Sequence, residues 1–384
     1  MSALLRLTRP YPFLDPDACI TVCERAAELS ARHRDELLEA RALLMAACWR
    51  IILNGWRKED ALTSAAAMEK IRRLRDVGFQ HFGEILYSHV LWTQGDYQEA
   101  LKNAEDGIPQ MIETQNLVVY LSALSSHSIA LMHLGRWGEV LRLTNTAIEA
   151  AEKSGNAPWR AIFQGLLAWL RTHCFDFEGA TSLYQVLIRT GGDDRTGQVR
   201  TIASITAGFT QLGMGRHQEA MRHLEEAGNP ETYARFFLHW YWRMIAQLGL
   251  GNAWLAGGDL ANASKAAGLF LKSALSTADP ALQALAWEAK ARVAMADEDW
   301  EGAQEHVESA GAALKPFEVP VVAWRVHATA AALYAQTGDA QKAERHHSRA
   351  GTLILQLANS FREGEPLQKS LLAAAAARRI LPTR

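Results

Sequence analysis

The sequence predicts an all-α protein, a superhelical solenoid of about eight helical hairpins with a 40-residue period. A turn signature recurs at nearly constant spacing, and small residues recur at two constant positions around it. The chain has 384 residues, longer than a single core usually grows, so a repeat array is a natural solution.

The turn signature places a residue that ends one helix before a residue that begins the next. Its first residue is glycine in five of the seven regular copies, because a reversing chain needs a left-handed backbone there. Successive copies lie 40 residues apart, with one spacing of 43 near Asn229-Pro230. The copies begin at Gly95, Gly135, Phe175, Gly215, Gly258, Glu298 and Gly338, and an irregular eighth copy, one residue longer, begins at Gly55.

Aspartates follow the turn in most copies, where a side-chain oxygen can cap the next helix. Glu99 stands at capping-box spacing from the first of them. The predicted caps are Asp96, Asp176, Asp259, Asp299 and Asp339.

Small residues recur on both helices of each hairpin, which predicts that the two backbones pack closely. Five residues after each turn stand Ala100, Val140, Ala180, Ala220, Ala263, Ala303 and Ala343. Seven residues before it stand Ser88, Ser128, Ala168, Gly208, Gly251, Ala291 and Ala331.

The chain divides into a proline-rich N-terminal arm, residues 1–15, and one repeat domain, residues 16–384. Helices from about Asp17 to Arg34 and from Pro366 to near Leu381 are expected to cap the array, because its end repeats would otherwise expose apolar faces.

Composition excludes several classes of function. Forty Lys and Arg against 42 Asp and Glu leave no basic footprint, so no direct nucleic-acid partner is expected. No apolar stretch suits a signal peptide or a membrane span, so we expect a cytoplasmic protein with no membrane partner. The cysteines lie in helical patterns without zinc spacing and are predicted core residues, namely Cys19, Cys23, Cys48 and Cys174.

The Gly-Asp-aromatic turn with its flanking small residues resembles the tetratricopeptide repeat, although this period is 40 rather than 34. The resemblance implies a right-handed superhelix. The runs from Ala284 to Leu314, Phe317 to Phe361 and Gly135 to Leu143, and the ending from Ser360 to Leu381, resemble the C-terminal helical sensor region of large bacterial ATPase transcriptional regulators of the MalT-like kind. That family implies a sensor that relays binding to an ATPase and a DNA-binding output. Two alternatives follow for this chain: a stand-alone sensor that acts on a separate ATPase or DNA-binding subunit, or the C-terminal part of a larger regulator.

Motifs for catalysis and cofactors are weak, and we expect neither an enzyme nor a cofactor. The segment Gly192–Gly197 lacks the lysine of a phosphate loop. Glu344 and His347 share a helix face without a second copy, so no metal is expected. The acid clusters Asp193-Asp194 and Asp297–Asp299 lie in predicted turns, which disfavours an α/α-toroid enzyme.

The candidate binding site is a stripe along the first helix of each hairpin, which lines the concave surface in tetratricopeptide folds. It mixes aromatic rings, which supply contact area, with polar groups that orient a ligand. Its candidate residues are His89, Trp92, Trp169, His173, Phe209, Asn252 and Arg292. The expected ligand is a protein, a peptide or a small effector. The alternative function is a structural scaffold that bridges two proteins through its convex face and ends.

Overall fold

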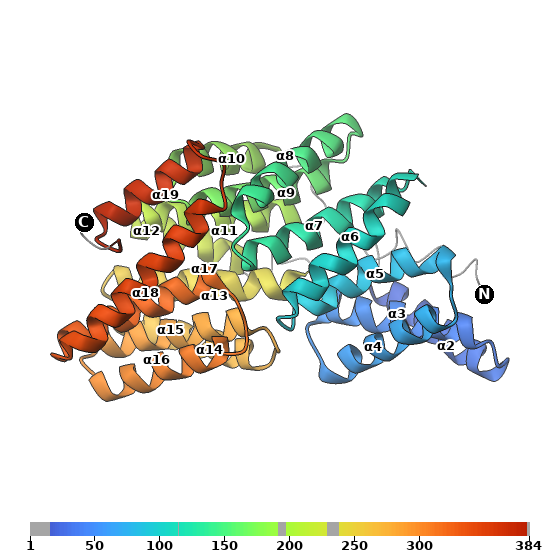
Figure 1. The fold of residues 1–384 in the computed structure, drawn as a ribbon, viewed down its shortest axis with the longest axis horizontal. Coiled ribbons are helices and arrows are strands. Elements are labelled where there is room, and N and C mark those ends of the chain that lie inside the picture. Colours follow the sequence, from blue (N-terminus) through green and yellow to red (C-terminus); the bar gives the residue numbers. More distant parts are fainter. Residues whose placement is uncertain (1–15, 114, 191–196, 229–237, 382–384) are drawn as a thin grey trace. The chain divides into compact units, whose positions relative to one another are not determined.

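The computed structural model describes residues 16–113, 115–190, 197–228 and 238–381, and every regular element among them is a helix (Figure 1). None of these helices is long and apolar enough to cross a bilayer. The predicted arm, residues 1–15, and the pair Asp193-Asp194 lie outside the described residues.

The helices after α2 (Pro16–Arg32) form eight consecutive pairs, as the period predicts. The final helix is α19 (Pro366–Ala377). The pairs are α3 (Glu36–Asn54) with α4 (Lys58–Arg73), α5 (Val77–Trp92) with α6 (Tyr97–Glu113), α7 (Leu117–His133) with α8 (Trp137–Lys153), α9 (Ala157–His173) with α10 (Phe177–Thr190), α11 (Gln198–Gly213) with α12 (His217–Gly228), α13 (His239–Ala256) with α14 (Leu260–Leu275), α15 (Pro280–Ala296) with α16 (Trp300–Leu314), and α17 (Pro320–Gln336) with α18 (Ala340–Asn359).

The predicted turn positions all adopt a left-handed backbone. Positive φ occurs at all eight first positions, from 107° at Gly55 to 59° at Phe175 and Glu298. A bulky residue such as Phe175 adopts this conformation only when its surroundings hold it there. The predicted register of the hairpins is therefore confirmed.

Four of the five predicted caps are confirmed by hydrogen bonds from backbone N–H groups to aspartate side chains. Asp176, Asp259, Asp299 and Asp339 accept from the residue three positions on, at 2.9–3.1 Å. Asp96 instead accepts from the Gln94 side chain at 2.7 Å. Glu99 accepts from the Asn103 amide at 3.1 Å, a contact that is not part of the predicted capping box.

The described chain falls into two compact units. Unit 1 comprises described residues of Met1–Ala130 and Ala234–Tyr241, and unit 2 those of Leu131–Tyr233 and Trp242–Arg384. The single repeat domain over residues 16–384 stays a prediction.

The small residues five positions after and seven positions before each turn form two small-residue columns. These columns lie in the helix contacts of both units. Every member is buried except Ala331 and Ala343, which belong to the last hairpin and are half-buried. A Cβ added at Gly208 would stand 2.4 Å from the Leu224 side chain. Ala303 packs with Ala291 and Leu333 in a buried cluster. The four cysteines are buried and free, so their assignment to the core is confirmed.

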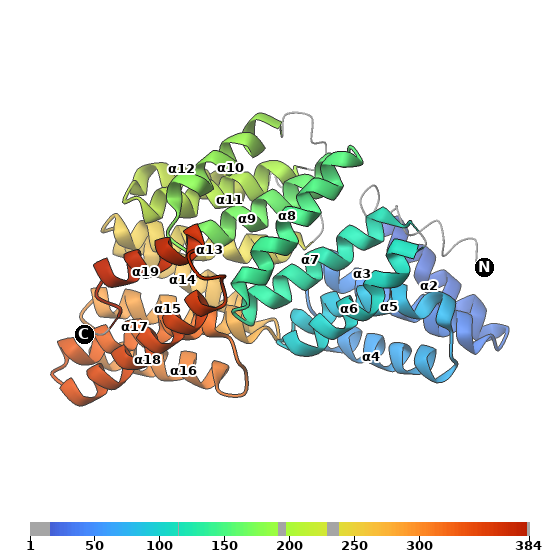
Figure 2. The same ribbon diagram turned by 45° about the horizontal axis from the view of Figure 1, so that its top comes forward.

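Unit 2 brings its last hairpin back against α8. The Gly138 N–H donates to Ser360 Oγ at 3.3 Å, and a Cβ at Gly138 would lie 2.2 Å from the Ser360 carbonyl oxygen. The buried Trp137 ring packs edge-on against Phe361, with centroids 6.5 Å apart. Figure 2 shows the end of α18 and the start of α19 beside α8.

A second contact joins the turn before α10 to the C-terminal helices. The Arg378 guanidinium lies 4.0 Å from the centroid of the Phe175 ring, and Trp324 of α17 lies 6.5 Å from it. These contacts hold the unfavourable left-handed backbone of Phe175 in place. Unit 2 is therefore a run of hairpins whose ends touch.

Enlarging a small-residue column should destabilise the fold. Ala220→Leu and Ala303→Leu should each lower the free energy of unfolding by roughly 1–3 kcal/mol, because the added atoms must enter a filled helix contact. Chemical denaturation followed by circular dichroism measures this. Ala261→Leu, at an exposed position of α14, is the matched control and should have little effect. Unchanged unfolding of both column variants would show that these columns do not mark helix contacts.

Gly138→Ala and Gly268→Ala should shift stability in opposite directions. At Gly138 the new methyl group collides with the Ser360 backbone, whereas at Gly268 of α14 it enters open space. The first change should destabilise unit 2, and the second should stabilise it by about 0.5–1 kcal/mol, because alanine is the better helix former. Melting temperatures test the pair. Equal shifts of the same sign would argue against the contact between α8 and α18.

Candidate functional site

The predicted stripe is distributed over the two units. His89 and Trp92 belong to unit 1, and the other five candidates belong to unit 2. Each lies on the first helix of its hairpin, as predicted.

In unit 1 the two candidates form a buried cluster. The Trp92 Nε1–H points at His89 Nδ1 at 3.4 Å, and His89 Nε2 lies 3.1 Å from Ser122 Oγ. Because Trp92 can only donate, His89 carries its proton on Nε2 and donates to the serine. Burial lowers the pKa of His89 to about 3. Both side chains are fully buried, so they support the helices of unit 1 and present no surface to a ligand.

Aromatic candidates of unit 2 pack on one another. The Trp169 ring centroid lies 4.6 Å from that of His173 and 4.8 Å from that of Phe209, both edge-on. His173 Nδ1–H donates to the Trp169 carbonyl at 2.9 Å, which fixes its ring. Trp169 and His173 keep part of their surface exposed, whereas Phe209 is buried. Trp169 and His173 are half-buried, so a ligand can contact only part of their surface, and Phe209 supports them.

The polar candidates of unit 2 belong to a charged network. Arg292 Nη1 donates to Asn252 Oδ1 at 2.7 Å, which joins α15 to α13. Arg292 Nε also lies 3.9 Å from the carboxylate of Glu288 one turn earlier. Glu288 accepts from Thr329 Oγ1 at 2.8 Å and lies 3.8 Å from Arg325 Nη2, both on α17.

The aromatic and charged groups lie near each other within unit 2. Burial lowers the pKa of His173 to about 4; its hydrogen bond to Trp169 opposes this shift, and the nearby Arg325 charge lowers the pKa further. Arg325 of α17 is thus an electrostatic neighbour of His173 of α9, a proximity that follows from the contact between the ends of unit 2. We call these two groups together the inner face of unit 2: Trp169, His173, Phe209, Asn252, Glu288, Arg292, Arg325 and Thr329.

One residue of the inner face, Arg292, also lines a pocket of about 340 Å³. Its lining adds apolar side chains from α13, α15 and α16 and one amide from α17, namely Leu255, Met295, Ala296, Trp300 and Gln336. Such a lining suits a mostly apolar group with a polar end.

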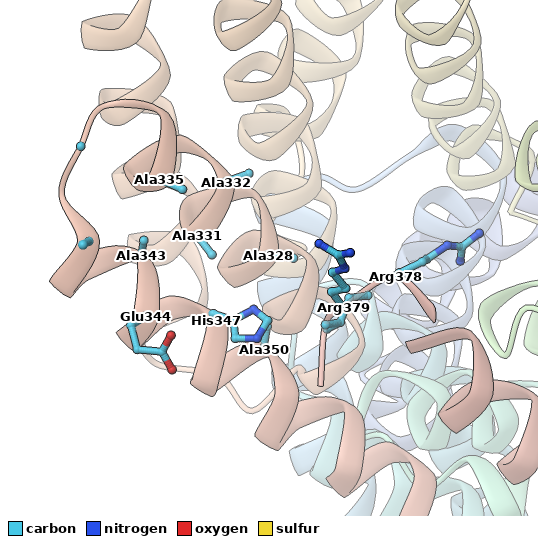
Figure 3. A pocket seen from close by; sticks show the side chains of 13 residues that line it. Ala328, Ala331, Ala332, Ala335, Ala343, Glu344, His347, Ala350, Arg378 and Arg379 are labelled. Atoms are coloured by element: carbon cyan, nitrogen blue, oxygen red, sulfur yellow. The ribbon is translucent and has the colours of Figure 1, made fainter. Parts of the chain in front are cut away.

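A larger hollow, about 600 Å³, lies on the last hairpin (Figure 3). Alanines of α17 and α18 form its floor, and Glu344, His347 and Arg379 lie at its rim. In earlier repeats the next hairpin covers this face, as α17 does for α15 and α16. The hollow therefore lies on the face of the last hairpin that a further hairpin would cover, and Arg378, Arg379 and Ile380 line it as well.

Sequence reasoning missed Glu288 and Arg325. Both lie on first helices, at positions ten and thirteen residues before the turns at Glu298 and Gly338. These positions share a helix face with the predicted stripe, which lies six residues before each turn. Extending the stripe by two helical turns toward the N-terminus would have found both residues.

The remaining chemical motifs have structural roles. Asp299 of the acid cluster caps α16. Glu344 accepts from Ser348 at 3.1 Å on the exposed side of α18. Among the residues described, no three His, Cys, Asp or Glu side chains gather as a metal site would require.

Comparisons with known proteins bear on the fold. No protein-family model and no curated protein matches the sequence. Many solved structures are similar to this chain, and two of them are described here. One is a Rap protein complexed with Competence and Sporulation Factor, with a TM-score of 0.69, 13% identity and coverage of 94% of this chain and 98% of the other. The other is the apo form of the quorum sensor NprR from B. thuringiensis, with a TM-score of 0.60, 13% identity and coverage of 92% and 98%.

At such low identity these likenesses show the fold, a tetratricopeptide-like helical solenoid, and they confirm the predicted fold class. The relation to ATPase regulators stays a prediction.

Acid should destabilise unit 2 through its buried histidines. The pKa values of His133 and His173 are lowered to about 3 and 4, so the unfolded chain takes up protons below about pH 6.5 while the folded chain does not. Stability therefore falls as pH drops from 6.5 toward 4, by about 2 kcal/mol per histidine at pH 5.

His173→Gln should remove the part of this acid-induced loss of stability that comes from one histidine. Urea unfolding of the protein and the variant at pH 7.5 and pH 5.0 measures the difference, and the pH 7.5 pair controls for the lost packing. If the variant loses as much stability between pH 7.5 and pH 5.0 as the unaltered protein does, His173 is not desolvated in the folded state.

Proposed function

We propose that this chain is a sensor-type binding module whose inner face in unit 2 binds a peptide or small effector. Binding is relayed to a separate ATPase or DNA-binding subunit, as the resemblance to MalT-like regulators implies. The chain itself binds rather than catalyses.

The observation that carries the proposal is that half-buried aromatic side chains occur together with an arginine whose position is fixed before any ligand binds. Trp169 and His173 are half-buried and pack on each other, and Arg292 is held by Asn252. Side chains fixed before binding lose little entropy on binding, so their contacts contribute more to affinity. Binding energy concentrates in Trp and Arg side chains of this kind.

The similar structures support a role in signalling. One was solved with Competence and Sporulation Factor, and the other is named a quorum sensor. A solenoid of the same fold thus serves elsewhere to hold a signal, and an inner face built from several hairpins suits that task.

A scaffold function is the second candidate, favoured by the hollow on the last hairpin. Its alanine floor is an apolar surface that a helix of another protein could cover. A scaffold would use this end and leave the inner face unoccupied.

Substitutions on the inner face should weaken ligand retention while preserving the fold. Trp169→Ala, His173→Ala and Arg292→Ala should each weaken binding, with the Trp and Arg changes costing about 2 kcal/mol or more, roughly thirtyfold in affinity. The ligand is first captured from the low-mass fraction of native host extract on immobilised protein and identified by mass spectrometry. Retention is then compared across variants, with folding checked by circular dichroism.

Glu225→Ala, at an exposed position of α12, is the control and should retain the ligand fully. Arg379→Ala, at the rim of the hollow, separates the two candidate functions. Full retention by the inner-face variants with loss in Arg379→Ala would reject the sensor function and favour the scaffold.

A further inference from the structure

We propose that the ligand of the inner face carries a carboxylate, which binds between Arg292 and Arg325, next to an apolar segment that contacts Trp169. This inference rests on the proposed function and adds the chemical class of the ligand.

Glu288 attracts the two arginines but does not occupy their hydrogen-bond donors. Its side chain is 3% exposed, and Thr329 is its hydrogen-bond donor. The two guanidinium groups approach its carboxylate only to 3.8 and 3.9 Å, beyond hydrogen-bond distance. A structural Arg–carboxylate pair usually forms shorter, two-pronged contacts. Glu288 therefore holds the arginines by charge and leaves their N–H groups available.

The two arginines have unused donors. A guanidinium group offers five N–H bonds. Within the described chain, Arg292 makes one hydrogen bond, to Asn252, and Arg325 makes none. Their side chains are 33% and 24% exposed, enough for a ligand to reach them. A carboxylate could accept from both.

Charge in the cluster favours an anion. Two arginines face one glutamate, and the neighbouring His173 is neutral because its pKa is lowered to about 4. Burial lowers the pKa of Arg325, Glu288 opposes this shift, and Arg292 adds to it by repulsion. A second carboxylate would balance the remaining positive charge in a partly desolvated place, where such pairing is strong.

The apolar surroundings define the rest of the ligand. Trp169 packs on His173, the electrostatic neighbour of Arg325. Leu255, Met295 and Trp300 line the pocket at Arg292, and no acidic side chain lines that pocket. A short apolar peptide with one carboxylate fits this arrangement, and a cationic ligand does not.

The test uses three matched libraries of short N-acetylated peptides built from Ala, Leu, Phe, Ser and Gly. One library has free C-terminal carboxylates, the second has C-terminal amides, and the third has C-terminal amides with a single Glu. Affinity selection on the full chain with mass spectrometry reads out retention. We expect the first or third library to be retained at least about tenfold better than the neutral second. The first and third together distinguish a terminal from a side-chain carboxylate.

Arginine variants locate the effect. Arg292→Gln and Arg325→Gln should each remove the preference for carboxylate peptides, with losses of about tenfold, while Arg292→Lys and Arg325→Lys should keep part of it. Lys272→Gln, at an exposed position of α14, removes the same charge elsewhere and should change nothing. If a Gln variant fails to fold, the Lys variant and the library comparison on the unaltered chain still decide.

The outcomes separate this inference from the proposed function. Equal retention of the neutral library, or a carboxylate preference that survives both Gln changes, overturns the carboxylate site and leaves the sensor function standing. If no library is retained and native extract also yields nothing that depends on Trp169, the sensor function itself fails. A preference for carboxylates that both Gln variants lose supports the inference.

Discussion

The inner face of unit 2 depends on one close approach, between the backbones at Gly138 and Ser360. Only a hydrogen atom fits between them, and a side chain at Gly138 would overlap the Ser360 carbonyl. Although 222 residues separate the two positions, this contact brings the end of α18 against the start of α8. Repeat arrays ordinarily join only neighbouring hairpins. Here an additional contact joins the last hairpin to one much earlier in the chain.

The consequence is chemical as well as structural. Arg325 belongs to the last hairpin and His173 to a hairpin far earlier in the chain, yet the charge of the first alters the pKa of the second. Glu288 and Arg292, on the hairpin between, complete a partly desolvated cluster. Such groups are costly to bury without full pairing, and the proposed binding role would account for this cost.

Because the fold is built from repeats, proteins with little sequence identity can share it. The two similar structures share 13% identity with this chain but nearly its whole length. What the fold requires is a left-handed residue at each turn and small residues where helices cross, and several residue types satisfy this. Phe175 meets the first requirement without glycine, because Arg378 and Trp324 contact its ring. The chemistry of the inner face is free to vary between proteins.

The sequence by itself determined the helical hairpins, their eight turns and the packed columns, because these depend on local backbone conformation and on side-chain size at fixed spacing. It also placed the stripe on the first helices, and Asn252 and Arg292 are indeed joined there. Only the tertiary structure showed that His89 and Trp92 are buried, and that Arg325 lies near His173. A repeat pattern specifies contacts between neighbours, whereas exposure and contacts between distant repeats follow from small rotations that accumulate from hairpin to hairpin.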